Sequence, residues 1–143
     1  SDKTNLLQPA LLPLDEQHWL AYMRMSGGSQ RIALAETRDA GEHWQDLPDL
    51  PLSNPNASVA VINAGGTPAL THNPSSHGRE HLVTSISSDG REWIAAADLA
   101  RGVTGDEYSY PAMLWHEDSL WVSYTDRRRH IAWQRFSIER RAP

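Results

Sequence analysis

Apolar and polar residues alternate along much of the chain in short runs. Residues 31–36 place Ile32 and Leu34 on one side of such a run, and residues 81–87 and 130–138 repeat the pattern. A period of two residues is typical of β-strands that bury one face. The pattern therefore predicts strands rather than helices.

The predicted strands fall into three rounds that are separated by turns rich in Gly, Pro, Asn and Ser. The expected strands are residues 8–14, 18–25, 31–36 and 44–47 in the first round, 57–62, 68–71, 81–87 and 93–97 in the second, and 109–115, 120–125 and 130–138 in the third. Rounds of four strands at a period near 50 residues are typical of β-propellers. A helical turn over residues 94–99 is the alternative, but that stretch is short and has no clear cap.

These rounds predict an all-β chain with about three four-stranded propeller blades. We expect a single segment over residues 1–143, with repeats over about residues 8–50, 54–100 and 107–138. The third round has no fourth strand, and an open row of blades leaves sheet edges uncovered. Closure of a ring then needs either a missing N-terminal half or a second copy of the chain.

Two similar polar turns end the third strand of the first and second rounds. They are residues 37–44 (TRDAGEHW) and 87–93 (SSDGREW), the second being one residue shorter. In such a turn the aspartate accepts backbone N–H groups, the glycine supplies a positive φ, and the tryptophan packs beneath. We therefore expect both turns to be structural, although Asp39, Glu42 and His43 stand together in the first.

The first turn matches the Asp-box pattern S/T-x-D-x-G-x-x-W, and the second, with Ser87, Asp89, Gly90 and Trp93, is a degenerate form that is one residue short. On these turns the chain resembles sialidases and other propellers with bacterial-neuraminidase repeats. The resemblance extends over nearly all 143 residues, through segments in the order QPALLPL, LAYMRM, SNPNAS, EYSYPAMLW and WVSYTDRRRHIAWQRF. It implies the C-terminal half of a six-bladed ring. It also implies a glycoside hydrolase that acts from the chain end on acidic or N-acylated sugars.

Sialidases use a tyrosine nucleophile that is assisted by a glutamate, an aspartate as acid/base, and three arginines that hold the sugar carboxylate. The resemblance implies that Arg24 is the second arginine, Arg79 the third and Tyr108 the nucleophile. The first arginine and the aspartate belong to the N-terminal half of that family. Gln8 stands where the glutamate is expected, and an amide cannot act as a base.

Three more polar residues are candidates for ligand contact. Asn54 and Asn56 stand at the entry to an innermost strand, and Tyr110 follows Tyr108 closely enough to line the same pocket. The leading interpretation is an exo-α-sialidase-like domain with little or no turnover in this chain by itself. The alternative is a non-catalytic carbohydrate-binding or protein-interaction propeller, which Gln8 favours.

Composition excludes several other functions. A net charge of −5 gives no support for nucleic-acid binding, so Arg127, Arg128 and Arg129 are expected to be a solvated turn. No apolar run approaches the length of a membrane span. The sequence has no glycine-rich phosphate loop of the kind that binds nucleotide cofactors. His72 and His77 stand in one loop, but no carboxylate or third histidine falls at the spacing of a metal site. No cofactor or metal is therefore expected.

The cellular compartment stays open at this stage. The chain has no cysteine, which leaves the redox compartment undecided. It shows no signal peptide and begins with Ser rather than Met, a start that suggests a fragment, a processed chain or a tag remnant. The resemblance to sialidases implies a periplasmic or secreted protein.

Overall fold

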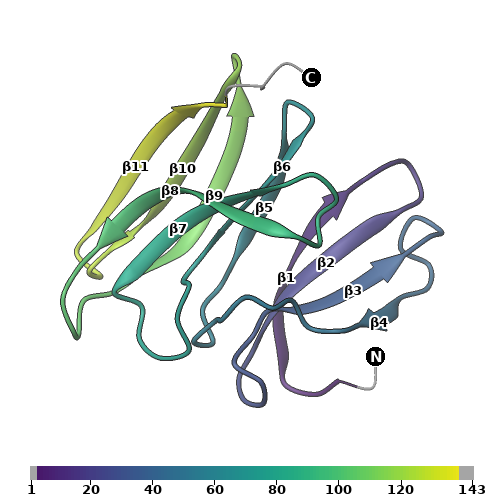
Figure 1. Cartoon of the computed structure of the whole chain (residues 1–143), viewed down its shortest axis with the longest axis horizontal. Helices are drawn as coiled ribbons and strands as arrows, with labels where there is room; N and C mark the ends of the chain where they lie inside the picture. The colour runs from purple at the N-terminus through teal and green to yellow at the C-terminus, as the bar shows by residue number, and fades with distance from the viewer. Residues whose placement is uncertain (1–2, 139–143) are drawn as a thin grey trace.

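The computed structural model describes residues 3–138, so the ends of the expected segment 1–143 lie outside the described part. These residues form eleven strands in three antiparallel sheets (Figure 1). The first sheet contains β1 (Leu6–Pro13), β2 (Trp19–Met25), β3 (Ala33–Thr37) and β4 (Gln45–Leu47). The second contains β5 (Ala60–Ala64), β6 (Thr67–His72), β7 (His81–Ser87) and β8 (Trp93–Arg101). The third contains β9 (Tyr108–His116), β10 (Ser119–Asp126) and β11 (His130–Ser137).

The all-β prediction is confirmed. Residues 94–99, the one helical alternative, lie inside β8, and no α-helix occurs between residues 3 and 138. Within that same range there is accordingly no helix with the length and apolar character needed to cross a membrane.

The three sheets stand side by side as successive blades of an open propeller array. Strands follow chain order within each sheet, and β5, the first strand of the second sheet, contacts both β1 and β9. The first strands of the three blades therefore lie next to one another, as strands do around a propeller axis (Figure 1). The third sheet ends at β11, so the described residues form an arc of three blades and not a closed ring.

Two apolar cores lie between neighbouring sheets. Leu12, Leu20 and Tyr22 of the first sheet pack with Leu70 of the second in one core. The other core joins the second and third sheets, and its buried members are Ala64, Ala69, Leu82, Leu99, Tyr108, Leu120, Val122 and Tyr124. Because each blade buries one face against the next, blade-to-blade packing supplies the apolar burial that stabilises the arc.

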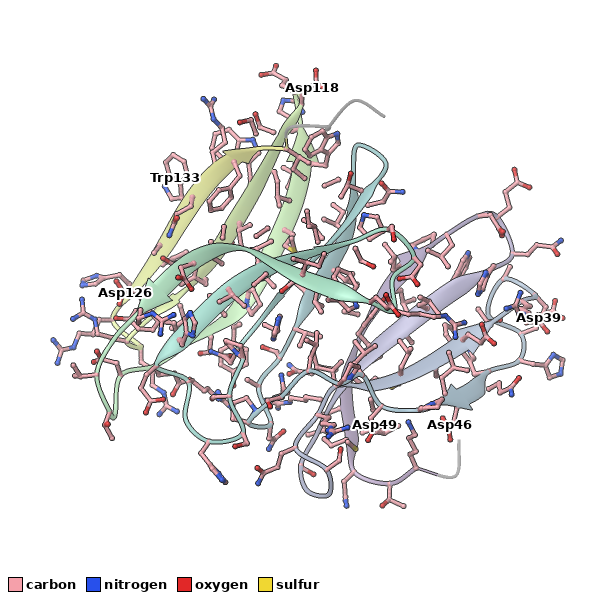
Figure 2. All side chains as sticks on the ribbon, in the orientation of Figure 1. Asp39, Asp46, Asp49, Asp118, Asp126 and Trp133 are labelled. Carbon is pink, nitrogen blue, oxygen red and sulfur yellow. The ribbon has the colours of Figure 1, made fainter. Side chains whose placement is uncertain are left out.

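Both predicted structural turns have the expected hydrogen bonds. In the first, Asp39 Oδ1 accepts from the His43 N–H at 2.9 Å and Gly41 has a φ of 96°. In the second, Asp89 Oδ1 accepts from Glu92 N–H at 2.9 Å, so the shorter turn keeps the same design. Figure 2 labels Asp39 and Asp126 on opposite sides of the molecule, and the first turn is remote from the β10–β11 end of the third blade.

Candidate functional site

One residue with a left-handed backbone marks the entry to each blade. Gln8, Asn56 and Tyr110 have φ values of 52°, 56° and 53°. Gln8 and Tyr110 each sit in a bulge, where the pairing of β1 with β2 and of β9 with β10 shifts by one residue. Both are followed by Pro-Ala, so the segments QPALL and YPAML are equivalent and carry a sequence signal that strand periodicity alone does not reveal.

The bulge in β9 separates the two candidate tyrosines. Residues two apart on a regular strand share a face, but an extra residue reverses that relationship. Tyr108 is 9% exposed, and its ring packs edge-on against Tyr124, with centroids 6.4 Å apart, in the core between the second and third blades. Tyr110 is 51% exposed, and the guanidinium carbon of Arg79 lies 5.9 Å from the centre of its ring.

Arg24 and Arg79 converge on a single acceptor. Arg24, near the end of β2, donates from Nη1 to the Asn56 carbonyl at 3.2 Å, and Arg79, in the loop before β7, donates from Nη2 to the same oxygen at 2.8 Å. The Arg24 Nε is buried and has no hydrogen-bond partner among residues 3–138. Two guanidinium groups therefore meet at one point and retain donors for a further acceptor.

Glu107 fixes the orientation of Arg79. Its Oε1 accepts from Arg79 Nη1 at 3.1 Å and from Ser109 Oγ at 2.8 Å, and its Oε2 pairs with Arg128 at 2.6 Å. Burial raises the pKa of Glu107, but the hydrogen bonds from Ser109 and Arg128 and the charges of both arginines outweigh it and leave the pKa below its usual range. Glu107 is therefore ionised and occupied, which makes it a poor proton acceptor.

Asn54 lies behind this site and not in it. The side chain is buried, its Nδ2 donates to the Ala57 carbonyl at 3.0 Å, and its Oδ1 accepts from the Ala57 N–H at 2.8 Å. These bonds close the loop that carries Asn56. Gln8 is exposed at the corresponding place of the first blade.

The structure thus brings four of the predicted residues together and leaves three elsewhere. The four are Arg24, Asn56, Arg79 and Tyr110. Tyr108 lies in the core, Asn54 in the loop scaffold and Gln8 on the first blade. Sequence analysis missed the link from Arg79 through Glu107 to Arg128, because the residues come from three separate loops and no local pattern joins them.

A separate group of side chains could hold a metal ion. One ligand atom each of Asp39, Glu42 and His43 lies within 4.8 Å of the others, at the surface of the first turn. The hydrogen bond from the His43 backbone, with those from the Thr37 and His43 side chains, lowers the pKa of Asp39 to about 2. These hydrogen bonds are made within the turn of residues 37–44, so they stabilise the turn whether or not an ion is bound. His72 is buried beside Ser85, whereas His77 is exposed, so the two histidines do not form a site.

The geometry is that of a propeller with repeated structural turns and a cationic cluster at the entry to its blades. The model of the BNR repeat-like domain matches residues 1–122. The chain belongs to this family. Membership confirms the sialidase-like repeat propeller that the sequence predicted. No match was found among the curated protein sequences.

Several solved structures of glycoside hydrolases are similar in fold to this chain. The Hadza microbial sialidase Hz136 matches with a TM-score of 0.77 at 18% identity, over 94% of this chain and 28% of that one. The α-L-arabinofuranosidase Arb93A of Fusarium graminearum matches with a TM-score of 0.70 at 14% identity, over 92% of this chain and 45% of that one. The sialidase NanB of Streptococcus pneumoniae matches with a TM-score of 0.64 at 16% identity, over 81% of this chain and 19% of that one.

At these identities the likeness shows the fold alone. The chain spans 28% of the length of the Hadza sialidase and 45% of that of the arabinofuranosidase, so it corresponds to a part of each propeller. The sialidase-type propeller fold is therefore established, and the described residues form three blades of it.

Proposed function

We propose that the chain forms part of a carbohydrate-binding site in a sialidase-like propeller, and that Arg24 and Arg79 bind the carboxylate of an acidic sugar. The observation that carries the proposal is the meeting of both guanidinium groups at the Asn56 carbonyl. Guanidinium groups pair with carboxylates through two parallel hydrogen bonds, and two of them surround such a group on two sides. The family and the glycosidase fold of the neighbours support a sugar as the ligand.

Tyr110 is the better candidate for the tyrosine of this site. It is exposed and lies against Arg79, whereas the Tyr108 ring is enclosed between two blades. A sugar held by the arginines would be within reach of an exposed phenol at the blade entry, but not of one in the core. Tyr108 then has a structural role, because its ring packs in the core and its backbone N–H donates to the Arg79 carbonyl at 2.9 Å.

Binding without turnover is the expected behaviour of this chain by itself. A tyrosine nucleophile needs a base, and the residue at the equivalent bulge of the first blade is Gln8. Glu107 does not replace it, because two arginines and Ser109 already occupy its carboxylate. The same observation favours the second candidate function, a carbohydrate-binding or protein-interaction propeller that lacks catalysis.

An NMR titration with N-acetylneuraminic acid tests the binding proposal. We expect millimolar affinity that is lost in Arg24→Gln and Arg79→Gln, because each substitution removes one charged pair with the ligand. Arg38→Gln is the matched control, since Arg38 carries the same charge in the first turn unit. N-acetylmannosamine, which has no carboxylate, should not bind. Equal binding of both sugars would contradict the proposal.

A fluorogenic sialoside separates the two candidate functions. We expect no cleavage by the chain. If cleavage is observed, Tyr110→Phe should abolish it and Tyr108→Phe should reduce it only through lost packing. Loss of cleavage in Tyr108→Phe alone would return the role of nucleophile to Tyr108.

The remaining blades of the ring would come from a second copy or from a further segment of a longer protein. The expected ligand also favours a periplasmic or secreted location, where acidic glycans are exposed to exo-acting glycosidases. Both statements rest on the sialidase-like reading of the site. No part of the proposed site requires a cofactor.

A further inference from the structure

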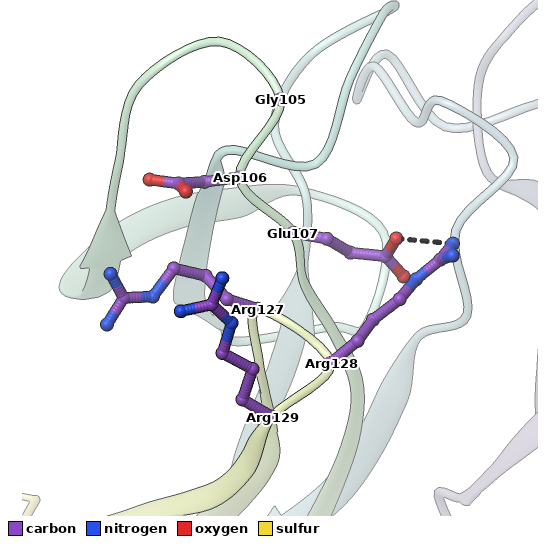
Figure 3. A pocket seen from close by; sticks show the side chains of 6 residues that line it. All are labelled: Gly105, Asp106, Glu107, Arg127, Arg128 and Arg129. Carbon is purple, nitrogen blue, oxygen red and sulfur yellow. Dashed lines mark ion pairs between the residues drawn. The ribbon is translucent and has the colours of Figure 1, made fainter.

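A cleft opens beside Glu107, between the β8–β9 loop and the β10–β11 turn. It has a volume of about 430 Å³ and is lined by Gly105, Asp106, Glu107, Arg127, Arg128 and Arg129 (Figure 3). We infer that this cleft is a second anion-binding subsite, which takes a carboxylate or sulfate ester on the sugar next to the one held by Arg24 and Arg79. The inference rests on the proposed function of that neighbouring site.

The β10–β11 turn places arginines where the backbone disfavours them. Arg127 and Arg128 have φ values of 49° and 57°, and the Arg129 N–H donates to the Asp126 carbonyl at 3.0 Å. The bond from Arg129 to Asp126 closes a four-residue turn over residues 126–129, and a turn with both central residues at positive φ favours Asn-Gly or Gly-Gly. The β5–β6 turn of this chain uses glycine in that conformation. The β9–β10 turn instead has Glu117 and Asp118 at φ values of 47° and 53°, so positive φ at charged residues occurs in two hairpins of this chain. The cleft and its charges, and not the backbone alone, therefore indicate a site at the β10–β11 turn.

The turn is attached firmly to the cleft. The Arg127 N–H donates to the Glu107 carbonyl at 2.6 Å, and Arg128 pairs with the carboxylate of the same residue at 2.6 Å. In Figure 3 Arg128 extends toward Glu107, while Arg127 and Arg129 extend together toward the side of Asp106. The opposite wall is also held, because Asp106 accepts from the Val103 N–H at 3.0 Å.

Most charges around the cleft are already matched within the chain. Arg127 pairs with Asp126 at 2.9 Å, and Arg128 pairs with Glu107. The Arg129 side chain has no ion pair within residues 3–138. The exposed guanidinium of Arg129 therefore remains for a ligand. Arg127, which pairs with Asp126, stands beside it in the same turn. A guanidinium presents the donor geometry that matches both carboxylate and sulfate oxygens.

Glu107 links the cleft to the proposed sugar site. The two oxygens of Glu107 join Arg79, which belongs to that site, to Arg128, which belongs to the cleft. An oligosaccharide with its terminal carboxylate on Arg24 and Arg79 can thus place a second anionic group over the turn. The subsite would make the protein prefer glycans with two acidic groups over glycans with one.

Binding of paired ligands by the 143-residue chain tests the subsite. The probes are N-acetylneuraminic acid against its α2,8-linked dimer, and sialyllactose against its 6-sulfated form, so that the two arms distinguish a carboxylate from a sulfate. We expect the doubly anionic probe of at least one arm to bind about fivefold more tightly, the upper range for an exposed ion pair. Arg129→Gln should bring that ratio close to one, and Arg38→Gln should not change it.

A second variant separates loss of the anion preference from loss of folding, and a sulfate titration detects anion binding without a sugar. Arg127→Asn places a residue that tolerates positive φ in the turn and keeps the pair of Arg128 with Glu107, so we expect an unchanged or higher Tm together with loss of the preference for two anions. Titration with inorganic sulfate should shift the Nε–Hε signals of Arg127 and Arg129 even if no sugar binds.

The outcomes separate this inference from the proposed function. If the monoanionic sugars bind through Arg24 and Arg79 but the preference is absent or survives Arg129→Gln, the subsite is wrong and the proposed function stands. If no sugar binds and sulfate shifts neither arginine signal, both are wrong. If sulfate alone binds at the turn, the anion subsite stands without the proposed function.

Discussion

The Tyr22 hydroxyl donates to the Gly90 carbonyl at 2.6 Å, across the boundary between the first and second blades. Tyr22 is fully buried in β2, and Gly90 lies in the turn between β7 and β8. The same carbonyl accepts from Trp93 Nε1 at 3.2 Å, and the Trp93 ring packs edge-on against Tyr22. The second structural turn is therefore fastened to the core of the preceding blade.

This relationship predicts a stability loss when the hydroxyl is removed. Tyr22→Phe should lower the free energy of unfolding by about 1 kcal/mol, because one buried hydrogen bond is lost while the bond from Trp93 remains. Chemical denaturation measures the difference. A change below about 0.3 kcal/mol would show that the bond across the blades contributes nothing net.

Gly90→Ala should cost more than the loss of that bond. Gly90 has a φ of 76°, and an added Cβ would lie 2.7 Å from Leu20 Cδ1 and 2.8 Å from the Tyr22 hydroxyl oxygen. Strain and overpacking together predict a loss of about 2–3 kcal/mol in the same denaturation experiment. In the double variant with Tyr22→Phe the losses should be less than additive, since the phenylalanine removes one of the two close contacts. Strict additivity would argue against a direct clash.

Asn54 and Asn56 should respond differently to substitution. Asn54→Ala removes both side-chain bonds to Ala57 and should lower the free energy of unfolding by about 2 kcal/mol. It should also weaken binding of N-acetylneuraminic acid, because the loop that presents the Asn56 carbonyl loosens. Asn56→Gly keeps that carbonyl and suits a φ of 56°, so stability and binding should both be preserved. Loss of binding in Asn56→Gly would mean that the Asn56 side chain, and not its carbonyl, serves the site.

Strand identity could be read from the sequence because period-two alternation and turn residues agree along the chain. The predicted ends of strands were less accurate where side chains hydrogen-bond to backbone groups that would otherwise pair with a neighbouring strand. The second blade was expected to begin at residue 57, but Asn54 takes the Ala57 backbone groups and β5 begins at Ala60. The last strand of that blade was expected to end at residue 97, but β8 continues to Arg101. Its pairing with β7 shifts at two bulges and goes on to the pair of His81 with Arg101.

The site was less predictable than the fold. Arg24 and Arg79 were identified through a family resemblance, since no spacing rule brings a strand end and a loop 55 positions later to one carbonyl. Tyr108 was chosen as the nucleophile through the same resemblance, and strand alternation does not reveal the bulge that separates it from Tyr110. Repeat comparison of the residues before each Pro-Ala would have shown that Gln8 and Tyr110 are equivalent.

The open face of the third blade predicts self-association. Leu114, Ile131 and Trp133 are more than half exposed there, and the Trp121 and Trp133 rings lie 5.3 Å apart. We expect sedimentation velocity to show association that rises with protein concentration, and Trp133→Glu to weaken it about tenfold or more, because a large apolar contact becomes a buried charge. Ile94→Glu is the matched control, since Ile94 is equally exposed but lies on β8. A monomer at all concentrations would refute this prediction.

Stability should depend on pH through His72. Burial lowers the pKa of His72 from 6.5 to about 4, and the ring, 2% exposed, has a hydrogen bond to Ser85 Oγ at 3.2 Å. Between these two pKa values the unfolded chain binds a proton that the folded chain does not. The free energy of unfolding is therefore highest above pH 6.5 and falls as the pH drops toward 4.

The loss from this one residue should be about 2 kcal/mol between pH 7 and pH 5. Carboxyls with lowered pKa values, such as those of Glu36 and Glu107, stay ionised over that range and do not contribute. His72→Gln keeps a donor for Ser85 without a titrating group, so urea unfolding at the two pH values should show a much smaller difference. His77→Gln controls for an exposed histidine and should behave like the unsubstituted chain. An equal pH dependence in all three proteins would show that His72 is protonated as readily in the folded chain as in the unfolded one.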